Sequence, residues 1–140
     1  IHRDMPTLVD DQFGNYVIQH VLQYGRARDK ASILKLVLSR GVLHVSRQKF
    51  ASNVVEKILV YGDAEQKATL VSEMLKSTSS GESVLVCMVR DAFANYVVQK
   101  ALEVAAVGQR AALVEVLRAH LAELRQYTFA KHIITKIEKE

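Results

Sequence analysis

Three pairs of hydrogen-bonding side chains recur along this chain at a spacing of four residues: Asn15 with Gln19, Ser52 with Glu56, and Asn95 with Gln99. An amide offers both donors and an acceptor, whereas an ionised carboxylate only accepts. On a helix, residues four positions apart lie on the same face. Each pair is therefore predicted to present one fixed pattern of donors and acceptors, and the pattern differs between pairs.

The pairs belong to a decapeptide that the chain repeats: FGNYVIQHVL starts at Phe13, FASNVVEKIL at Phe50, FANYVVQKAL at Phe93 and FAKHIITKIE at Phe129. At about 100 degrees per residue, the phenylalanine and the following valines and isoleucines fall on one side of a helix. We expect these apolar residues in the core. The outward face then carries the first, second and fifth letters of a five-residue string: Asn15, Tyr16 and Gln19; Ser52, Asn53 and Glu56; Asn95, Tyr96 and Gln99; Lys131, His132 and Thr135.

The decapeptides are positioned by a repeat of about 36 residues. Successive phenylalanines are 37, 43 and 36 residues apart, and the excess falls in the Ser- and Gly-rich stretch 76–83, which is predicted to be an exposed loop. Second amphipathic segments start at Asp29, Asp63 and Gly108. We expect Asp29 and Asp63 to be N-caps and Gly41 and Gly62 to end helices. Repeated helix pairs of this length predict an all-α solenoid.

Composition and single residues limit the chemistry. The chain has 140 residues, 49% of them hydrophobic and 24% charged, as in a globular domain. Its net charge of +4 favours a polyanionic partner. The first ten residues lack the pattern of a secretory signal, and no apolar run could cross a membrane. Cys87 is the only cysteine, which excludes an intrachain disulfide and favours a reduced, intracellular setting; we expect it to be buried.

Neither catalysis nor a cofactor is expected from these residues. The histidines are scattered without the spacing of metal ligands: His2, His20, His44, His120 and His132. No carboxylates cluster, no nucleophile has a partnered base, and no Gly-rich phosphate loop is present. We therefore expect no enzyme activity, no metal, no cofactor and no small-molecule substrate.

The strings NYVIQ (15–19), SNVVE (52–56) and NYVVQ (95–99) resemble those of the Pumilio (PUF) family of RNA-binding repeat proteins. The resemblance extends over essentially the whole chain. It implies a right-handed, superhelical α-solenoid with a concave RNA-binding face, corresponding to the C-terminal repeats of a longer array. We divide the chain into a partial repeat (1–25), a full repeat (26–62), a full repeat with the inserted loop (63–105) and a C-terminal capping repeat (106–140).

In the family that the chain resembles, the first and fifth letters read one base per repeat and the second letter stacks between bases. Asn with Gln suits uracil, whose edge alternates acceptors with a donor. Ser52 with Glu56 suits guanine, because a carboxylate accepts from two adjacent N–H groups. Tyr16 and Tyr96 are good stacking platforms, and Asn53 is a poorer one. The family's antiparallel strand polarity then implies the element 5′-UGU-3′.

Five further residues could touch the RNA. His20, Lys57 and Lys100 follow the fifth letter. They either attract phosphate, make contacts between adjacent repeats, or are simply solvated. The final string, KHIIT (131–135), departs from the base-reading pattern, because Lys131 and Thr135 are not a recognised edge-reading pair. This copy is therefore expected to be the terminal cap, in which His132 or Lys131 could meet the RNA end or a phosphate.

The alternative to an RNA reader is a protein-binding scaffold of the HEAT or armadillo type. The family resemblance further implies post-transcriptional repression in the cytoplasm, through the 3′ untranslated regions of mRNA. Regulatory protein partners are expected on the outer, convex surface and at the 76–83 loop. The first copy lacks a preceding paired helix, so an exposed apolar flank could promote self-association.

Overall fold

The computed structural model describes residues 12 to 138, and their side chains from Tyr16 onward. Within this range the only pairing of extended backbone is an isolated bridge between Ser77 and Ser83. The helices are α2 (Gln12–Tyr24), α3 (Ala27–Arg40), α4 (Val42–Ser46), α5 (Ala51–Tyr61), α6 (Ala64–Met74), α7 (Val84–Val89), α8 (Ala94–Val104), α9 (Val107–Ala119), α10 (Leu121–Leu124), the 3-10 turn η1 (Thr128–Ala130) and α11 (Lys131–Glu138). The predicted all-α fold is confirmed.

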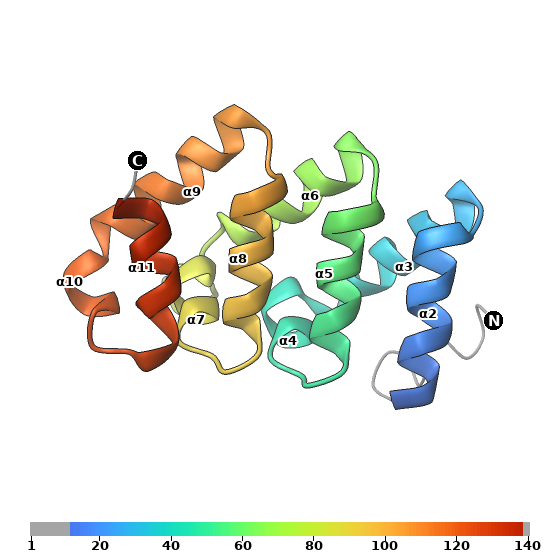
Figure 1. Cartoon of the computed structure of the whole chain (residues 1–140), viewed down its shortest axis with the longest axis horizontal. Helices are drawn as coiled ribbons and strands as arrows, with labels where there is room; N and C mark the ends of the chain where they lie inside the picture. Colours follow the sequence, from blue (N-terminus) through green and yellow to red (C-terminus); the bar gives the residue numbers. More distant parts are fainter. Residues whose placement is uncertain (1–11, 139–140) are drawn as a thin grey trace.

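The helices are arranged in rows along the molecule (Figure 1). The front helices α2, α5, α8 and α11 stand side by side and follow one another from right to left in chain order. Helix α5 packs against both α2 and α8, and in a second row α6 packs against α3 and α9. Each helix thus packs against the equivalent helices of neighbouring repeats, which is the architecture of an α-solenoid.

Each repeat contains a third, short helix, so our expectation of helix pairs was wrong. Helices α4, α7 and α10 have 5, 6 and 4 residues. Helix α4 packs on α5 and α7 on α8, and their apolar residues are buried. A segment this short does not complete enough turns for helical periodicity to be recognised in the sequence. The repeat is therefore a unit of three helices.

The predicted helix ends are correct in three of four places. Asp63 is the N-cap of α6, where its carboxylate accepts from the Gln66 N–H at 2.8 Å in a capping box. Gly41 ends α3 with φ of 95°, and Gly62 ends α5. Asp29 is not a cap, because α3 begins earlier and Arg26 is its N-cap residue. Asp29 lies instead in the first turn, where its charge suits the positive end of the helix dipole.

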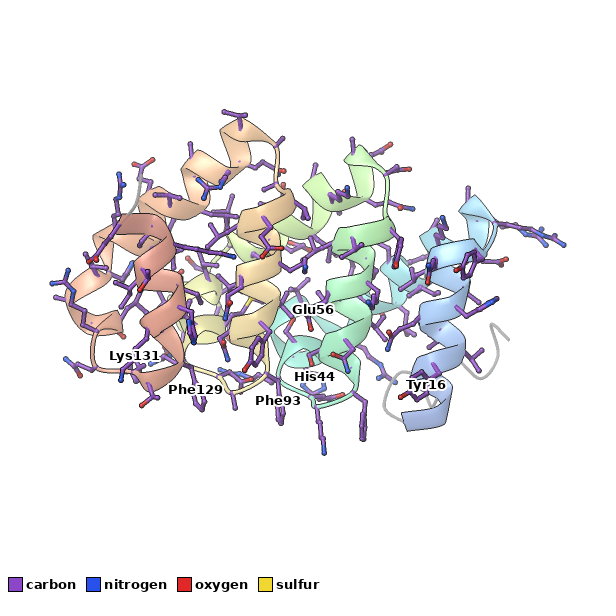
Figure 2. The ribbon with its side chains drawn as sticks, in the orientation of Figure 1. Tyr16, His44, Glu56, Phe93, Phe129 and Lys131 are labelled. Atoms are coloured by element: carbon purple, nitrogen blue, oxygen red, sulfur yellow. The ribbon has the colours of Figure 1, made fainter. Side chains whose placement is uncertain are left out.

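The apolar frame of the decapeptide is buried, except for its phenylalanines and for Val17 on α2, which is 45% exposed although it was expected in the core. Val54, Val97 and Ile133 are completely buried. Phe93 and Phe129, by contrast, are 37% and 44% exposed, so their assignment to the core was wrong. Phe93 directly precedes α8, and Phe129 lies in the 3-10 turn η1 that precedes α11. Both side chains lie at the lower edge of the molecule (Figure 2). Phe50 is partly buried, and the side chain of Phe13 lies outside the described part.

The insertion at 76–83 is an exposed loop, as predicted. Its backbone folds back on itself through bonds from the Thr78 N–H to the Glu82 carbonyl (2.7 Å) and from the Gly81 N–H to the Thr78 carbonyl (2.9 Å). Gly81 has φ of 89°, a conformation that favours glycine. The Arg90 guanidinium lies 2.9 Å from Glu82 and so ties the loop to the end of α7. The loop is therefore a defined element between α6 and α7.

No helix between Gln12 and Glu138 is long and apolar enough to cross a membrane. The same part of the chain contains no group of three or more His, Cys, Asp or Glu side chains placed to hold a metal ion. Cys87 is buried, as predicted, and its Sγ atom lies 3.2 Å from the Arg90 guanidinium.

Candidate nucleic-acid interface

The second and fifth letters of the repeated strings occupy the front helices at two depths. The second letters Tyr16 and Tyr96 are 66% and 57% exposed, and Asn53 is also exposed. The fifth letters are only partly exposed: Gln19, Glu56 and Gln99. A flat molecule could therefore lie against the second letters while its polar edge meets the fifth letters.

The first letters lie deeper than the sequence indicated. Ser52 is 4% and Asn95 is 3% exposed, although both were expected on the outward face. Asn15 belongs to α2, but its side chain lies outside the described part of the structure. The Ser52 hydroxyl donates to the backbone carbonyl of Lys49 at 3.1 Å. The first letter is thus held against the start of its own helix.

Asn95 is held by more bonds than Ser52. Its Nδ2 group donates to the carbonyls of Asp91 (2.8 Å) and Ala92 (2.9 Å), and its Oδ1 accepts from Gln99 Nε2 at 3.1 Å. Ala92 and Lys49 are equivalent, since each directly precedes the repeated phenylalanine. Ser52 and Asn95 therefore bond to equivalent backbone carbonyls of their repeats. Asn95 in addition orients Gln99, the fifth letter of its string.

A groove of about 450 Å³ joins three of the front helices. Its lining residues are Tyr16 and Gln19 from α2, Phe50, Asn53, Glu56, Lys57 and Val60 from α5, and Lys100 from α8. Figure 2 shows Glu56 on the side of α5 that faces α8. The groove therefore brings together second and fifth letters from neighbouring repeats that are 37 residues apart in the sequence.

The electrostatics of the groove centre on Glu56. Partial burial raises the pKa of this carboxyl above its usual value, because the charged form loses hydration. The positive charges of Lys100 and, to a smaller extent, Lys57 act in the opposite direction, while Glu103 adds a smaller effect that raises the pKa further. Glu56 is thus an acceptor whose charge depends on its neighbours.

The three basic residues that follow the fifth letters differ in their contacts. The exposed His20 ring lies 4.9 Å from the ring of Tyr24, and the Lys57 ammonium lies 5.8 Å from the ring centre of Tyr61. Lys100 Nζ is 3.0 Å from Glu103 Oε2. All three residues have protein contacts, and two of them also line the groove.

Sequence reasoning missed one contact of this kind. Lys136 holds the equivalent place in the last copy, and its ammonium lies 3.0 Å from Glu103 Oε1. The two oxygens of Glu103 thus bind one lysine from α8 and one from α11. The signal was present, because Lys136 follows the fifth letter of its string as His20, Lys57 and Lys100 do.

Helix α11 presents its letters differently. Lys131 and His132 are exposed, as expected of surface positions, and Lys131 lies at the lower edge of the molecule (Figure 2). The fifth letter, Thr135, donates its hydroxyl to the backbone carbonyl of Lys131 at 3.0 Å. The hydroxyl proton of Thr135 is therefore used within the helix.

The chemistry of this surface suits a chain of flat, polar, negatively charged units. Tyrosine rings can stack on aromatic bases, amides and a carboxylate can pair with base edges, and the groove lysines can attract phosphates. The repeats present these groups at regular intervals along the front row. A single-stranded nucleic acid has such a repeating structure.

Comparison with known proteins agrees with this chemistry. The model of the Pumilio-family RNA-binding repeat matches residues 11–38, 41–75 and 86–118. The chain belongs to the Pumilio family and is built from its RNA-binding repeats. The matches start at other points of the repeat than our division into 1–25, 26–62, 63–105 and 106–140, which stays a prediction.

Individual relatives show the same similarity. The chain is 44% identical to Pumilio homolog 4 of Arabidopsis thaliana over 133 residues, which are 95% of this chain and 13% of the relative. It is 36% identical to the mRNA-binding protein puf3 of Schizosaccharomyces pombe, covering 94% of this chain and 18% of the relative. The chain thus spans less than a fifth of the length of these relatives.

Solved structures confirm the fold as an α-solenoid of the PUF type. The structure of PUF-8 in complex with PBE-RNA superposes with a TM-score of 0.91 at 34% identity, over 99% of this chain and 40% of that one. The Puf3 RNA-binding domain bound to a Cox17 RNA 3′ UTR site gives a TM-score of 0.86 at 33% identity, over 97% and 42%. Both of these proteins are bound to RNA.

Proposed function

We propose that this chain binds single-stranded RNA with one base per repeat and prefers the element 5′-UGU-3′. The observation that carries the proposal is the groove between α2, α5 and α8, in which Glu56 is the one carboxylate among the described lining residues. Glu56 lines this groove together with the second letters Tyr16 and Asn53. The same face of the neighbouring repeats carries amides at the fifth position, Gln19 and Gln99.

The specificity follows from hydrogen-bond complementarity. An ionised Glu56 accepts from N1–H and N2–H of guanine, and these charge-assisted bonds are stronger than neutral ones. Uracil or adenine would place an acceptor against the carboxylate. Gln99, oriented by Asn95, keeps one N–H and its carbonyl oxygen for the edge of uracil. With the family's antiparallel polarity, α8 reads the 5′ uracil, α5 the guanine and α2 the 3′ uracil.

The test compares short RNAs that contain UGU or UUU at the central site, for the wild type and for Ser52→Asn combined with Glu56→Gln. The wild type should prefer UGU by roughly tenfold or more, which corresponds to about 1.5 kcal/mol for hydrogen bonds to a charged group. The double variant should prefer UUU. If folded wild type binds both RNAs equally, the polar letters do not read bases, and a scaffold of the HEAT or armadillo type becomes the better explanation.

We further propose that the protein acts in the cytoplasm on 3′ untranslated regions of mRNA and represses their translation or stability. Regulatory protein partners would bind the convex surface and the 76–83 loop. The support is the family relationship together with the exposed, hydrogen-bonded loop between α6 and α7. Replacing the loop with a short Gly-Ser turn should weaken partner binding without changing RNA affinity, and unchanged partner binding would exclude the loop as a contact.

A further inference from the structure

We propose that Lys100 is a positioning residue for guanine recognition: from α8 its ammonium shares the groove with the Glu56 carboxylate of the preceding repeat and favours guanine at that carboxylate. This inference rests on the proposed function, because it assigns a second residue to the guanine site. It differs from the family's scheme of first, second and fifth letters, since Lys100 follows its own repeat's fifth letter and acts on a neighbouring repeat.

The geometry places Lys100 and Glu56 in one site. Both side chains line the groove, although they come from helices whose letters are 43 residues apart in the repeat pattern. Glu56 lies on the side of α5 that faces α8 (Figure 2). Helices α5 and α8 pack closely along their length. Lys100 is therefore the cation that the following repeat contributes to this groove.

The charges around Glu56 come from three helices. Lys57 belongs to α5, Lys100 and Glu103 belong to α8, and Lys136 reaches Glu103 from α11. Helix α2 contributes Tyr16 and Gln19 to the groove, and neither is a carboxylate or a basic side chain. Of the positive charges that favour the ionised form of Glu56, Lys100 has the largest effect.

Lys136 changes how strongly the charge of Lys100 acts on Glu56. Glu103 binds Lys100 through one oxygen and Lys136 through the other, each at 3.0 Å. Two ammonium groups on one carboxylate leave a net positive charge at the end of the groove. Without Lys136, Glu103 would neutralise Lys100 more completely. The capping helix α11 thus influences the guanine site without touching it.

The protonation state of Glu56 decides which base fits. The ionised carboxylate offers two acceptors and matches the two N–H donors of guanine. The protonated carboxyl offers one donor and one acceptor, so it can pair with bases that present an acceptor, including uracil and adenine. Because Lys100 opposes protonation, it favours guanine and disfavours the other bases. A lysine that only attracted phosphate would instead strengthen binding to every RNA equally.

The experiment measures the affinities of UGU, UUU and UAU RNAs from pH 5 to pH 8 for the wild type, Lys100→Gln, Glu56→Gln and the double variant. In the wild type, the preference for UGU should fall on acidification, because guanine binding requires the ionised carboxylate. In Lys100→Gln this fall should be shifted upward by roughly half to one pH unit. The preference at the midpoint should drop by about three- to tenfold.

Two comparisons identify the cause. With Glu56→Gln as background, Lys100→Gln should leave the base preference unchanged, because its effect passes through the carboxylate. Lys136→Gln should change the preference in the same direction as Lys100→Gln but less. Lys35→Gln, a change of exposed lysine on α3 in the second row, serves as the matched control and should have no effect.

The outcomes separate this inference from the proposed function. If the wild type shows no preference for UGU at any pH, the proposed function itself fails. If the wild type prefers UGU and Lys100→Gln keeps both that preference and its pH profile, Lys100 is not a positioning residue. Equal loss of affinity for all three RNAs, with a weaker salt dependence, would overturn the inference in favour of a phosphate contact.

Discussion

In α8 the first letter, Asn95, accepts a hydrogen bond from the fifth letter, Gln99, at 3.1 Å. In α5 the first letter, Ser52, donates instead to the backbone carbonyl of Lys49 and makes no bond to the fifth letter, Glu56. Within residues 12–138, no hydrogen bond or ion pair joins Glu56 to another side chain. The pKa of Glu56 is raised by partial burial, and the charges of Lys100 and Lys57 oppose this effect.

This difference shows two ways to prepare a polar side chain for a ligand. The amide of α8 is oriented in advance by short-range bonds, whose geometry does not depend on pH or salt. The carboxylate of α5 is instead subject to partial burial and to the charges of nearby lysines, and the effect of these charges depends on both pH and salt. The same apolar frame therefore supports a fixed site and an adjustable one, and substitutions that exchange residues between α5 and α8 test the distinction.

The largest effect is expected in the core, where the two helices differ in volume. Ile58 of α5 and Ala101 of α8 hold equivalent places, and both are buried. Ile58→Ala should lower the free energy of unfolding by about 2–5 kcal/mol, because the cavity can close only in part. Urea unfolding measures this loss. Ile58→Val, which removes one carbon atom, is the control and should cost only about 0.5–1.5 kcal/mol, and a loss below about 1 kcal/mol for Ile58→Ala would show that α5 repacks freely.

The next effect concerns the hydrogen bonds of the first letter. Asn95→Ser gives α8 the letter of α5. The serine can keep the bond to the Ala92 carbonyl, as Ser52 does with Lys49, but the bonds to Asp91 and Gln99 are lost. We expect a loss of about 1–2 kcal/mol in unfolding free energy. The preference for uracil at this site should weaken as well.

Thermal and urea unfolding, with RNA binding in parallel, measure both effects of Asn95→Ser. Ser52→Ala removes a single bond and should cost less. An Asn95→Ser variant that is as stable as the wild type and equally selective would contradict the view that Gln99 is oriented by Asn95.

A smaller effect, of opposite sign, is expected at Ser46. Its hydroxyl is completely buried and has no hydrogen-bond partner among the described residues, and the next repeat has the equally buried Val89 at this place. Ser46→Ala should raise the free energy of unfolding by about 1 kcal/mol, because no unpaired hydroxyl then needs to be buried. Urea unfolding measures the gain, and Val89→Ser should reverse it. A destabilised Ser46→Ala would indicate that the hydroxyl has a partner after all.

The smallest effect is the stability cost of the charge on Glu56. Folding raises the pKa of this carboxyl, so the folded protein holds the proton more tightly than the unfolded chain. The ionised form is therefore unfavourable at neutral pH, and this cost disappears as the pH falls through the raised pKa. At pH 7.5, Glu56→Gln should raise the Tm by roughly one to two degrees, a small change because the partly exposed group is screened by solvent.

The Tm difference between Glu56→Gln and the wild type should shrink as the pH is lowered to 4.5. Gln99→Glu places a carboxylate on α8, and it should lower the Tm at neutral pH, whereas Glu56→Gln should raise it. A lower Tm for Glu56→Gln at pH 7.5 would mean that the ionised carboxylate stabilises the fold.

The sequence predicted the repeat and the front helices because these depend on local periodicity. The buried valines and isoleucines of the decapeptide follow directly from it. Helices α4, α7 and α10 were not predicted, since segments of four to six residues are too short for their periodicity to distinguish a helix from a strand. Phe93 and Phe129 were wrongly placed in the core, because the helical wheel was extended to residues that precede the first helical turn.

At the candidate site, the sequence predicted which helix face carries the letters but not their depth. The burial of Ser52 and Asn95 depends on where each helix begins and on carbonyls of the preceding turn, which a wheel does not represent. The contact of Lys136 with Glu103 joins α11 to α8 and could not be read from a single repeat, whereas Lys100 and Glu103 form an i,i+3 pair within α8. Contacts between repeats are tertiary, so a periodic sequence only restricts them.

The loop at 76–83 makes the path along the chain from Phe50 to Phe93 six residues longer than the path from Phe13 to Phe50. Helix α5 nevertheless packs closely against α8 on one side and α2 on the other. The added residues are mostly exposed at the joint between α6 and α7, and the packing of α5 against both neighbours is kept. This joint is therefore a place where the protein can be lengthened or altered, by evolution or by design. Such a change would keep each front helix opposite the same unit of a bound polymer.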